Sequence, residues 1–208
     1  MTFGFSTAVD IATEAIDRLH TTAESHDRIM IAEVMGRHVG HIAAWAGMAG
    51  GATIVLIPEE KFNIDRVAES LTRRHNAGRY ASIVVVAEGA LPEEGTMELR
   101  QPDVDQYGHQ RLGGISNVIA EEIEHRTGFE TRVTVLGHVQ RGGSPNPFDR
   151  VLGTRLGIAA IDAAQDKDYG KMVALQNGSI VTVPLEEAVG SLKVVSPEFW
   201  DAAKNFFA

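Results

Sequence analysis

Two spacings of apolar residues alternate along the chain. From residue 5 to 20 apolar side chains recur every three or four positions, as on one face of an amphipathic helix, and an almost unbroken apolar run follows at 28–35. Similar runs predict further strands, and the stretches between them predict helices. This alternation favours an α/β fold, a three-layer αβα arrangement around a mostly parallel sheet. The expected strands are 28–35, 53–57, 81–87 and 132–136, and the expected helices are 5–20, 38–49, 63–76, 113–127 and 148–164.

Residues with special backbone roles mark several ends of these elements. Asn63 is expected to cap the helix that follows it, and Gly50 and Gly51 are expected to end the helix before them. Asn177-Gly178 separates two short apolar runs, which is a strong hairpin signal. The remaining expected elements are hairpin strands at 172–175 and 180–183, a polar surface loop over 91–112, and helical stretches at 185–192 and 197–207.

Composition and charge exclude several classes of protein. The 208 residues are 44% hydrophobic, which is enough for a folded core, and the net charge of −9 repels nucleic acid and anionic membranes. The absence of cysteine excludes disulfides, thiolate zinc sites and thiol nucleophiles. With no secretory signal and no apolar stretch long enough to cross a membrane, the chain is expected in the cytoplasm, without nucleic-acid or membrane partners.

Residues suited to anion binding follow the first expected strand. In a parallel α/β sheet the ligand lies outside the carboxyl ends of the strands, which is where Met35, Gly36 and Arg37 stand. Arg37 comes just before a helix, so its guanidinium and the free N–H groups of the helix start could share one anion. The alternative is a solvated arginine in a strand–helix loop.

Two later strands bring further candidates to the same edge. Glu88 directly follows the run 81–87, and its carboxylate would suit sugar hydroxyls rather than phosphate. The alternative is a loop carboxylate in water. His138 and Arg141 lie on a glycine-rich turn that combines cations, exposed N–H groups and a helix start, as phosphate binding requires. The alternative is a turn that merely needs its glycines. No metal site is proposed, because the histidines show no pairing with carboxylates beyond chance.

Two arginines stand at the wrong ends of their strands for this site. Arg28 and Arg132 begin their strands, at the edge of the sheet opposite to Arg37 and His138. We therefore expect that they do not reach the same ligand within one subunit, although they could do so from a neighbouring one.

At these residues the chain resembles the bacterial-type 6-phosphofructokinase family. The most specific motif is Gly-His-Val-Gln-Arg-Gly-Gly-Ser-Pro at 137–145, and the motifs run in family order over nearly the whole chain. The matching stretches are 3–8, 14–19, 33–37, 134–145 and 148–150.

The resemblance implies a substrate and a role for each candidate residue. Met35, Gly36 and Arg37 would contact fructose 6-phosphate, Glu88 its hydroxyls, and His138 and Arg141 its phosphate. Arg28 and Arg132 would come from the adjacent subunit of a homo-oligomer, expected as a homotetramer. The implied activity is magnesium-dependent transfer of a phosphoryl group from ATP or pyrophosphate to the 1-hydroxyl of the sugar, a step of glycolysis.

The resemblance also implies that parts of the active site are missing. In the family a glycine-rich donor loop, a magnesium carboxylate and a Thr-Ile-Asp-Asn-Asp run with the catalytic base precede the matching part. The chain is therefore expected to be a carboxyl-terminal portion of a phosphofructokinase-like fold, with its first domain largely absent and no catalytic residue of its own. The alternatives are a non-catalytic sugar-phosphate-binding module or partner of a full-length subunit and, more remotely, a sugar-phosphate isomerase on the same fold.

The expected domain plan follows from this interpretation. Residues 1–139 would form a sugar-phosphate-binding domain, 140–190 part of a donor-binding domain, and 191–208 a helical segment that packs back on the first. Because the part after Gly142 would normally pack on the absent domain, it should expose apolar side chains. These are expected to be Val151, Leu152, Leu156, Ile158 and Ile161.

Overall fold

The computed structural model describes residues 2–98 and 114–207 and divides into two compact units. The larger unit combines Asp10–Gln140 with Val194–Ala208, and the smaller unit combines Met1–Val9 with Arg141–Lys193. The predicted loop over 91–112 lies outside the described residues from position 99 onward.

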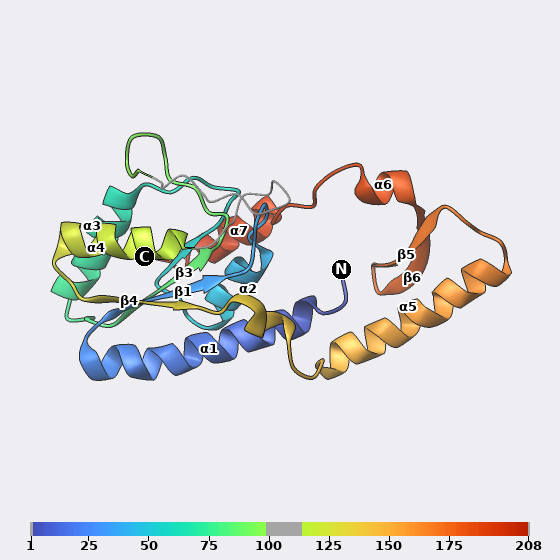
Figure 1. Cartoon of the computed structure of the whole chain (residues 1–208), viewed down its shortest axis with the longest axis horizontal. Helices are drawn as coiled ribbons and strands as arrows, with labels where there is room; N and C mark the ends of the chain where they lie inside the picture. Colours follow the sequence, from blue (N-terminus) through green and yellow to red (C-terminus); the bar gives the residue numbers. More distant parts are fainter. Residues whose placement is uncertain (1, 99–113, 208) are drawn as a thin grey trace, which may run out of the picture. The chain divides into compact units, whose positions relative to one another are not determined.

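A four-stranded parallel sheet forms the centre of the larger unit (Figure 1). Its strands are β1 (Ile29–Val34), β2 (Ile54–Leu56), β3 (Ser82–Ala87) and β4 (Thr131–Val135), in the order β2-β3-β1-β4. β1 and β3 are buried along their whole length, as near-continuous apolar strands of a covered parallel sheet are. β1 is therefore flanked on both sides, by β3 and by β4.

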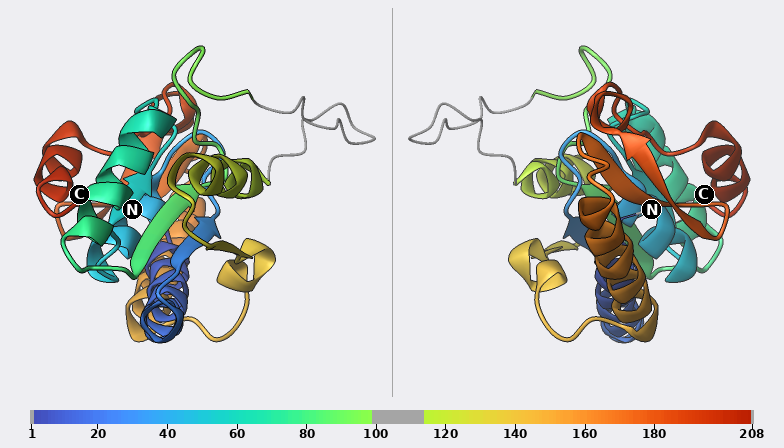
Figure 2. Two further views of the ribbon diagram at one scale, coloured as in Figure 1. Left: turned by 90° about the vertical axis from the view of Figure 1, so that its left-hand side faces the viewer. Right: turned by 90° about the vertical axis from the view of Figure 1, so that its right-hand side faces the viewer.

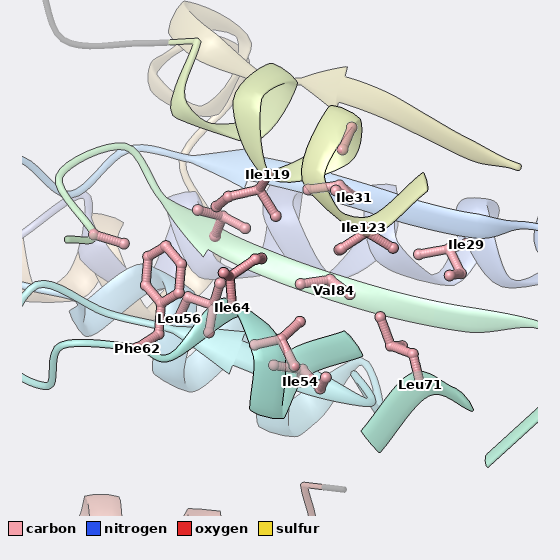
Figure 3. Packing of buried hydrophobic residues seen from close by; sticks show 14 residues of the cluster. Ile29, Ile31, Ile54, Leu56, Phe62, Ile64, Leu71, Val84, Ile119 and Ile123 are labelled. Atoms are coloured by element: carbon pink, nitrogen blue, oxygen red, sulfur yellow. The ribbon is translucent and has the colours of Figure 1, made fainter. Parts of the chain in front are cut away.

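Helices cover both faces of this sheet, which confirms the three-layer prediction (Figure 1 and Figure 2). The helices α3 (Ile64–Asn76) and α4 (Ile115–Thr127) pack on one face through a cluster of buried aliphatic residues (Figure 3). On the other face lie α1 (Phe5–His26) and α2 (His41–Ala49). α2 needs glycine there, since a Cβ at Gly47 would lie 2.5 Å from Val55 and one at Gly50 would lie 2.6 Å from Ile16.

The predicted ends of elements fall close to the observed ones. The Asn63 side chain accepts hydrogen bonds from the backbone N–H groups of Asp65 and Arg66 and so caps α3. Gly51, just beyond α2, is in the left-handed region at φ 66°. α1 runs six residues past its predicted end at 20, because the buried Ala23 continues its apolar stripe.

The smaller unit contains one long helix and a hairpin. α5 (Pro147–Gln165) packs against the antiparallel strands β5 (Lys171–Gln176) and β6 (Ser179–Pro184). The predicted Asn177-Gly178 turn joins them, with both residues at positive φ. A short helix, α6 (Leu185–Val189), follows and ends before the predicted boundary at 192.

The prediction of exposed apolar residues on α5 is correct for three positions and wrong for two. Val151, Ile158 and Ile161 are 59%, 60% and 60% exposed. Leu152 and Leu156 are buried, because the helix face that carries them is covered when α5 packs against the hairpin. The sequence alone indicated no such partner within the chain.

The C-terminal segment returns to the larger unit as α7 (Pro197–Lys204). Phe199 stacks on Trp45 of α2 with ring centroids 5.0 Å apart, and the Trp200 indole donates a hydrogen bond of 2.6 Å to Glu60. Among the helices of the described residues, none combines the length and apolarity that a membrane crossing requires.

Candidate functional site

The loops that follow β1, β3 and β4 meet at the carboxyl edge of the sheet. Val34, the last residue of β1, pairs with Ala87 of β3, and Glu33 pairs with Val135 of β4. Met35 therefore emerges between the loop that begins at Glu88 and the turn that begins at Gly137. Because these three strands are adjacent, residues 50 to 100 positions apart in sequence lie at one edge.

The loop after β1 rests directly on the turn after β3. The backbone N–H of Gly89 donates to the Gly36 carbonyl at 3.0 Å, and the Glu88 carboxylate accepts from the Gly36 N–H at 3.3 Å. A Cβ at Gly89 would lie 1.9 Å from the Arg37 carbonyl oxygen, so only glycine permits this approach. Glu88 thus supports the loop that carries Arg37, a contact that the sequence did not reveal.

Two candidate side chains at this edge are open to solvent. Arg37 and His138 are exposed, and neither side chain makes a hydrogen bond or ion pair with another described residue. His138 lies in a 3-10 turn, η1 (Gly137–Arg141), whose first residue is left-handed at φ 50°. Arg141, the other predicted phosphate ligand, ends this turn, is exposed, and belongs by sequence to the smaller unit.

Gln140 lies beneath this edge and was not singled out from the sequence. Its side chain is 1% exposed; its amide oxygen accepts from the Met35 N–H at 3.2 Å and its amide nitrogen donates to the Gly137 carbonyl at 3.1 Å. A glutamine in a glycine-rich turn is usually exposed, so nothing in the sequence predicted that Gln140 is buried.

Glu59 fastens the far end of the loop after β1. Its carboxylate accepts from the Gly40 N–H at 2.9 and 3.1 Å and from the Val195 N–H at 3.0 Å. The Glu59 side chain, in the turn after β2, therefore holds both the start of α2 and the C-terminal segment by hydrogen bonds. This residue was also missed, because a glutamate in a Pro-Glu-Glu-Lys turn looks like surface charge.

Arg28 and Arg132 lie at the opposite end of the sheet. Arg132 pairs with Met30 early in β1, and both arginines contact Glu130, Arg28 through its Nε at 2.7 Å. The hydrogen bond from Arg28 is the largest cause that lowers the pKa of Glu130, and the charge of Arg132 adds to it. Within this chain the two arginines are thus held at the amino edge, away from Arg37.

A concave feature among the described residues lies away from this edge. An open groove of about 660 Å³ lies between α3 and α4, with Asp65, Arg73 and Arg126 among its lining residues. Arg126 is already engaged by Asp65 at 2.7 Å and by Glu122, so its charge is satisfied. Within residues 2–98 and 114–207, no three His, Asp or Glu side chains converge as a metal ion would require.

The chain is similar to several known proteins. A family model described as "Phosphofructokinase" matches residues 1–164. The chain is 56% identical to a pyrophosphate–fructose 6-phosphate 1-phosphotransferase of Streptomyces coelicolor and 54% identical to an ATP-dependent 6-phosphofructokinase of Corynebacterium efficiens, in each case over 99% of the chain and 60% of the relative. It thus spans about 60% of the length of these relatives.

Solved structures give the same result for the fold. A phosphofructokinase of Saccharomyces cerevisiae superposes with a TM-score of 0.75 at 32% identity, over 91% of this chain and 24% of that one. A phosphofructokinase of Pichia pastoris gives 0.75 at 33% identity, over 99% of this chain and 21% of that one.

Proposed function

Because the chain belongs to the phosphofructokinase family, we propose that it holds fructose 6-phosphate for phosphoryl transfer to the 1-hydroxyl, giving fructose 1,6-bisphosphate. The observation that carries the proposal is the convergence of three loops at one sheet edge, where the Arg37 guanidinium is exposed and its loop is fixed by backbone contacts. An exposed guanidinium on a fixed loop is suited to a sugar phosphate.

Each candidate residue has a place in this proposal. Met35, Gly36 and Arg37 line the sugar-phosphate site, and Glu88 accepts from sugar hydroxyls through the oxygen that does not hold Gly36. His138 and Arg141 bind the phosphate, Arg141 on the strength of the family resemblance alone. Arg28 and Arg132 act from a neighbouring subunit of a homo-oligomer, which explains two guanidinium groups held at the amino edge.

The donor and the metal ion enter the proposal only through the family. ATP-dependent and pyrophosphate-dependent relatives are almost equally similar to this chain, at 54% and 56% identity, so its residues do not discriminate the donor. The described residues contain no acidic cluster that fits Mg²⁺, so no step is derived through the metal. Binding and orienting the sugar is the contribution of this chain, and a cytoplasmic homotetramer working in glycolysis completes the proposal.

Isothermal titration calorimetry with fructose 6-phosphate tests this function. Arg37→Ala should weaken binding at least about tenfold, because a hydrogen bond to a charged group contributes roughly 1.5–3 kcal/mol. Arg18→Ala is the matched control, since Arg18 pairs with Glu14 on the exposed surface of α1 and should bind normally. Fructose without its phosphate should bind far more weakly to the wild-type chain.

Two outcomes would contradict the proposal. One is a wild-type chain that does not bind the sugar phosphate; the other is an Arg37→Ala variant that binds it unchanged. A second candidate function is sugar-phosphate binding without turnover, since the chain spans about 60% of the length of its relatives. A coupled assay for fructose 1,6-bisphosphate, with ATP or pyrophosphate and Mg²⁺, distinguishes the two candidates.

A further inference from the structure

We propose that Gln140 is a positioning residue, whose buried amide fixes the Met35–Arg37 loop against the Gly137–His138 turn and so sets the geometry of the sugar-phosphate site. The inference rests on the function proposed above, since it concerns the same edge of the sheet. It adds a residue that touches no ligand and acts through the two loops that do.

The hydrogen-bond ladder between β1 and β4 is interrupted where β4 runs into η1. In a parallel pair, one residue donates its N–H to a neighbouring strand and accepts from the N–H two positions further along that strand. The Leu136 N–H donates to the Glu33 carbonyl at 3.0 Å, so a continuing ladder would bring the Met35 N–H to the Leu136 carbonyl. That carbonyl instead accepts from the Val139 N–H at 3.2 Å, because the chain has turned into η1.

The Gln140 side chain replaces the lost backbone partner. Its amide oxygen accepts from the Met35 N–H, and its amide nitrogen donates to the Gly137 carbonyl. The ladder is thereby extended by one step past the ends of both strands. Because the side chain is 1% exposed, water does not compete for either bond.

These bonds fix the two backbone segments that carry Arg37 and His138. Met35 leads directly into Gly36 and Arg37, and Gly137 leads directly into His138. Arg37 and His138 have no side-chain partner among the described residues, so their positions depend on the backbones that carry them. Glu88 holds Gly36 from the β3 side, and Gln140 holds Met35 from the β4 side. Both neighbours of β1 thus fix the loop that leaves it.

A glutamine is the side chain this arrangement requires. Its primary amide offers an acceptor to Met35 and a donor to Gly137 in one planar group. Gln140→Met has similar length and removes both bonds. Gln140→Glu keeps an acceptor for the Met35 N–H but sets a carboxylate oxygen against the Gly137 carbonyl. It therefore separates the hydrogen bond to Met35 from the hydrogen bond to Gly137.

The experiment combines fructose 6-phosphate calorimetry with amide hydrogen exchange on the full 208-residue chain. We expect Gln140→Met to weaken binding about tenfold and to speed exchange of the Met35 N–H, at a temperature where circular dichroism shows the variant folded. Gln140→Glu should weaken binding while the Met35 N–H keeps its protection. Gln165→Met, the same substitution at the exposed end of α5, should change neither quantity.

The outcomes separate this inference from the function on which it rests. A fast-exchanging Met35 N–H in the wild-type chain would overturn the inference without any variant, because it would show that Gln140 does not protect this group. Normal sugar-phosphate affinity in folded Gln140→Met would overturn the positioning role and leave the proposed function intact. A wild-type chain without affinity for the sugar phosphate would overturn the proposed function, and the positioning role with it.

Discussion

Gly89 shows how a single missing side chain shapes the candidate site. A methyl group there would lie 1.9 Å from the Arg37 carbonyl oxygen and 2.8 Å from that of Gly36. Both obstacles are backbone atoms, which cannot turn aside as the end of a flexible side chain can. The loop that presents Arg37 could accept the methyl group only by moving away from the turn after β3.

Gly89→Ala is therefore expected to reduce both stability and ligand affinity. The free energy of unfolding should fall by about 1–3 kcal/mol, as for other overpacked sites, and fructose 6-phosphate affinity should fall with it. Gly157→Ala is the control, because a Cβ at that position on α5 meets open space and should stabilise the helix by about 0.5–1 kcal/mol. Urea unfolding and calorimetry measure the two effects, and normal affinity in Gly89→Ala would contradict the close approach.

The sequence alone predicted the roles of residues that act within their own turn. It did not predict the roles of residues whose partners are distant in the sequence. Asn63 and Gly51 act within their own turns, so their residue type alone indicated what they do. Gln140 and Glu59 act on backbone groups 105 and 136 positions away, at Met35 and Val195. Nothing in their immediate sequence records those partners, and only the folded chain brings them together.

Among the elements, the start of α5 is fastened to the N-terminal segment of the smaller unit. The buried Asp149 carboxylate accepts from the Thr7 N–H at 2.8 Å and from the Thr7 hydroxyl at 2.6 Å. Asn146, which caps α5, donates its backbone N–H to the Thr7 hydroxyl at 3.0 Å. Burial alone would raise the pKa of Asp149, but the two bonds from Thr7 oppose it and the net effect lowers the pKa below 3.8.

This lowered pKa gives stability a definite pH dependence. Since the carboxylate is favoured in the folded state, its contribution is fully present above the unfolded pKa near 3.8 and is lost as pH falls through the folded value. The difference in free energy of unfolding between wild type and Asp149→Asn should thus be largest near neutral pH and shrink in acid. Urea unfolding from pH 7 to 3 measures it, with exposed Asp162→Asn as control. A pH-independent difference would contradict the role of the hydrogen bonds between Asp149 and Thr7.

The element pattern itself was largely readable from the sequence, because apolar spacing reports which face of an element is covered. The strands β1 and β3 and the helices α3 and α5 lie within a few residues of their predicted bounds. The error on α5 concerned packing: Leu152 and Leu156 share a helix with Val151, and periodicity alone did not tell which face the hairpin would cover.

For the whole molecule, the exposed residues of α5 determine solution behaviour. Val151, Ile158 and Ile161 are spaced by seven and three positions, so they form one apolar stripe on the helix. Contiguous exposed apolar surface promotes association. We expect the 208-residue chain to self-associate, with a soluble fraction that rises when all three residues are changed to lysine.

Light scattering and analytical ultracentrifugation test this expectation. The control is Leu152→Lys, which places a charge at a buried position and should lower the melting temperature rather than improve solubility. A wild-type chain that stays monomeric and melts sharply at high concentration would contradict the prediction.

The strand order has a consequence for how the chain is made. Ile29 of β1 pairs with Ser82 of β3 on one side and with Thr131 of β4 on the other. These partners follow Ile29 in the sequence by about 50 and about 100 positions. During synthesis this largely apolar strand leaves the ribosome long before either neighbour exists, and its edges stay unpaired in the meantime. The edge that carries the proposed sugar-phosphate site can accordingly form only after the turn ending at Arg141 has emerged.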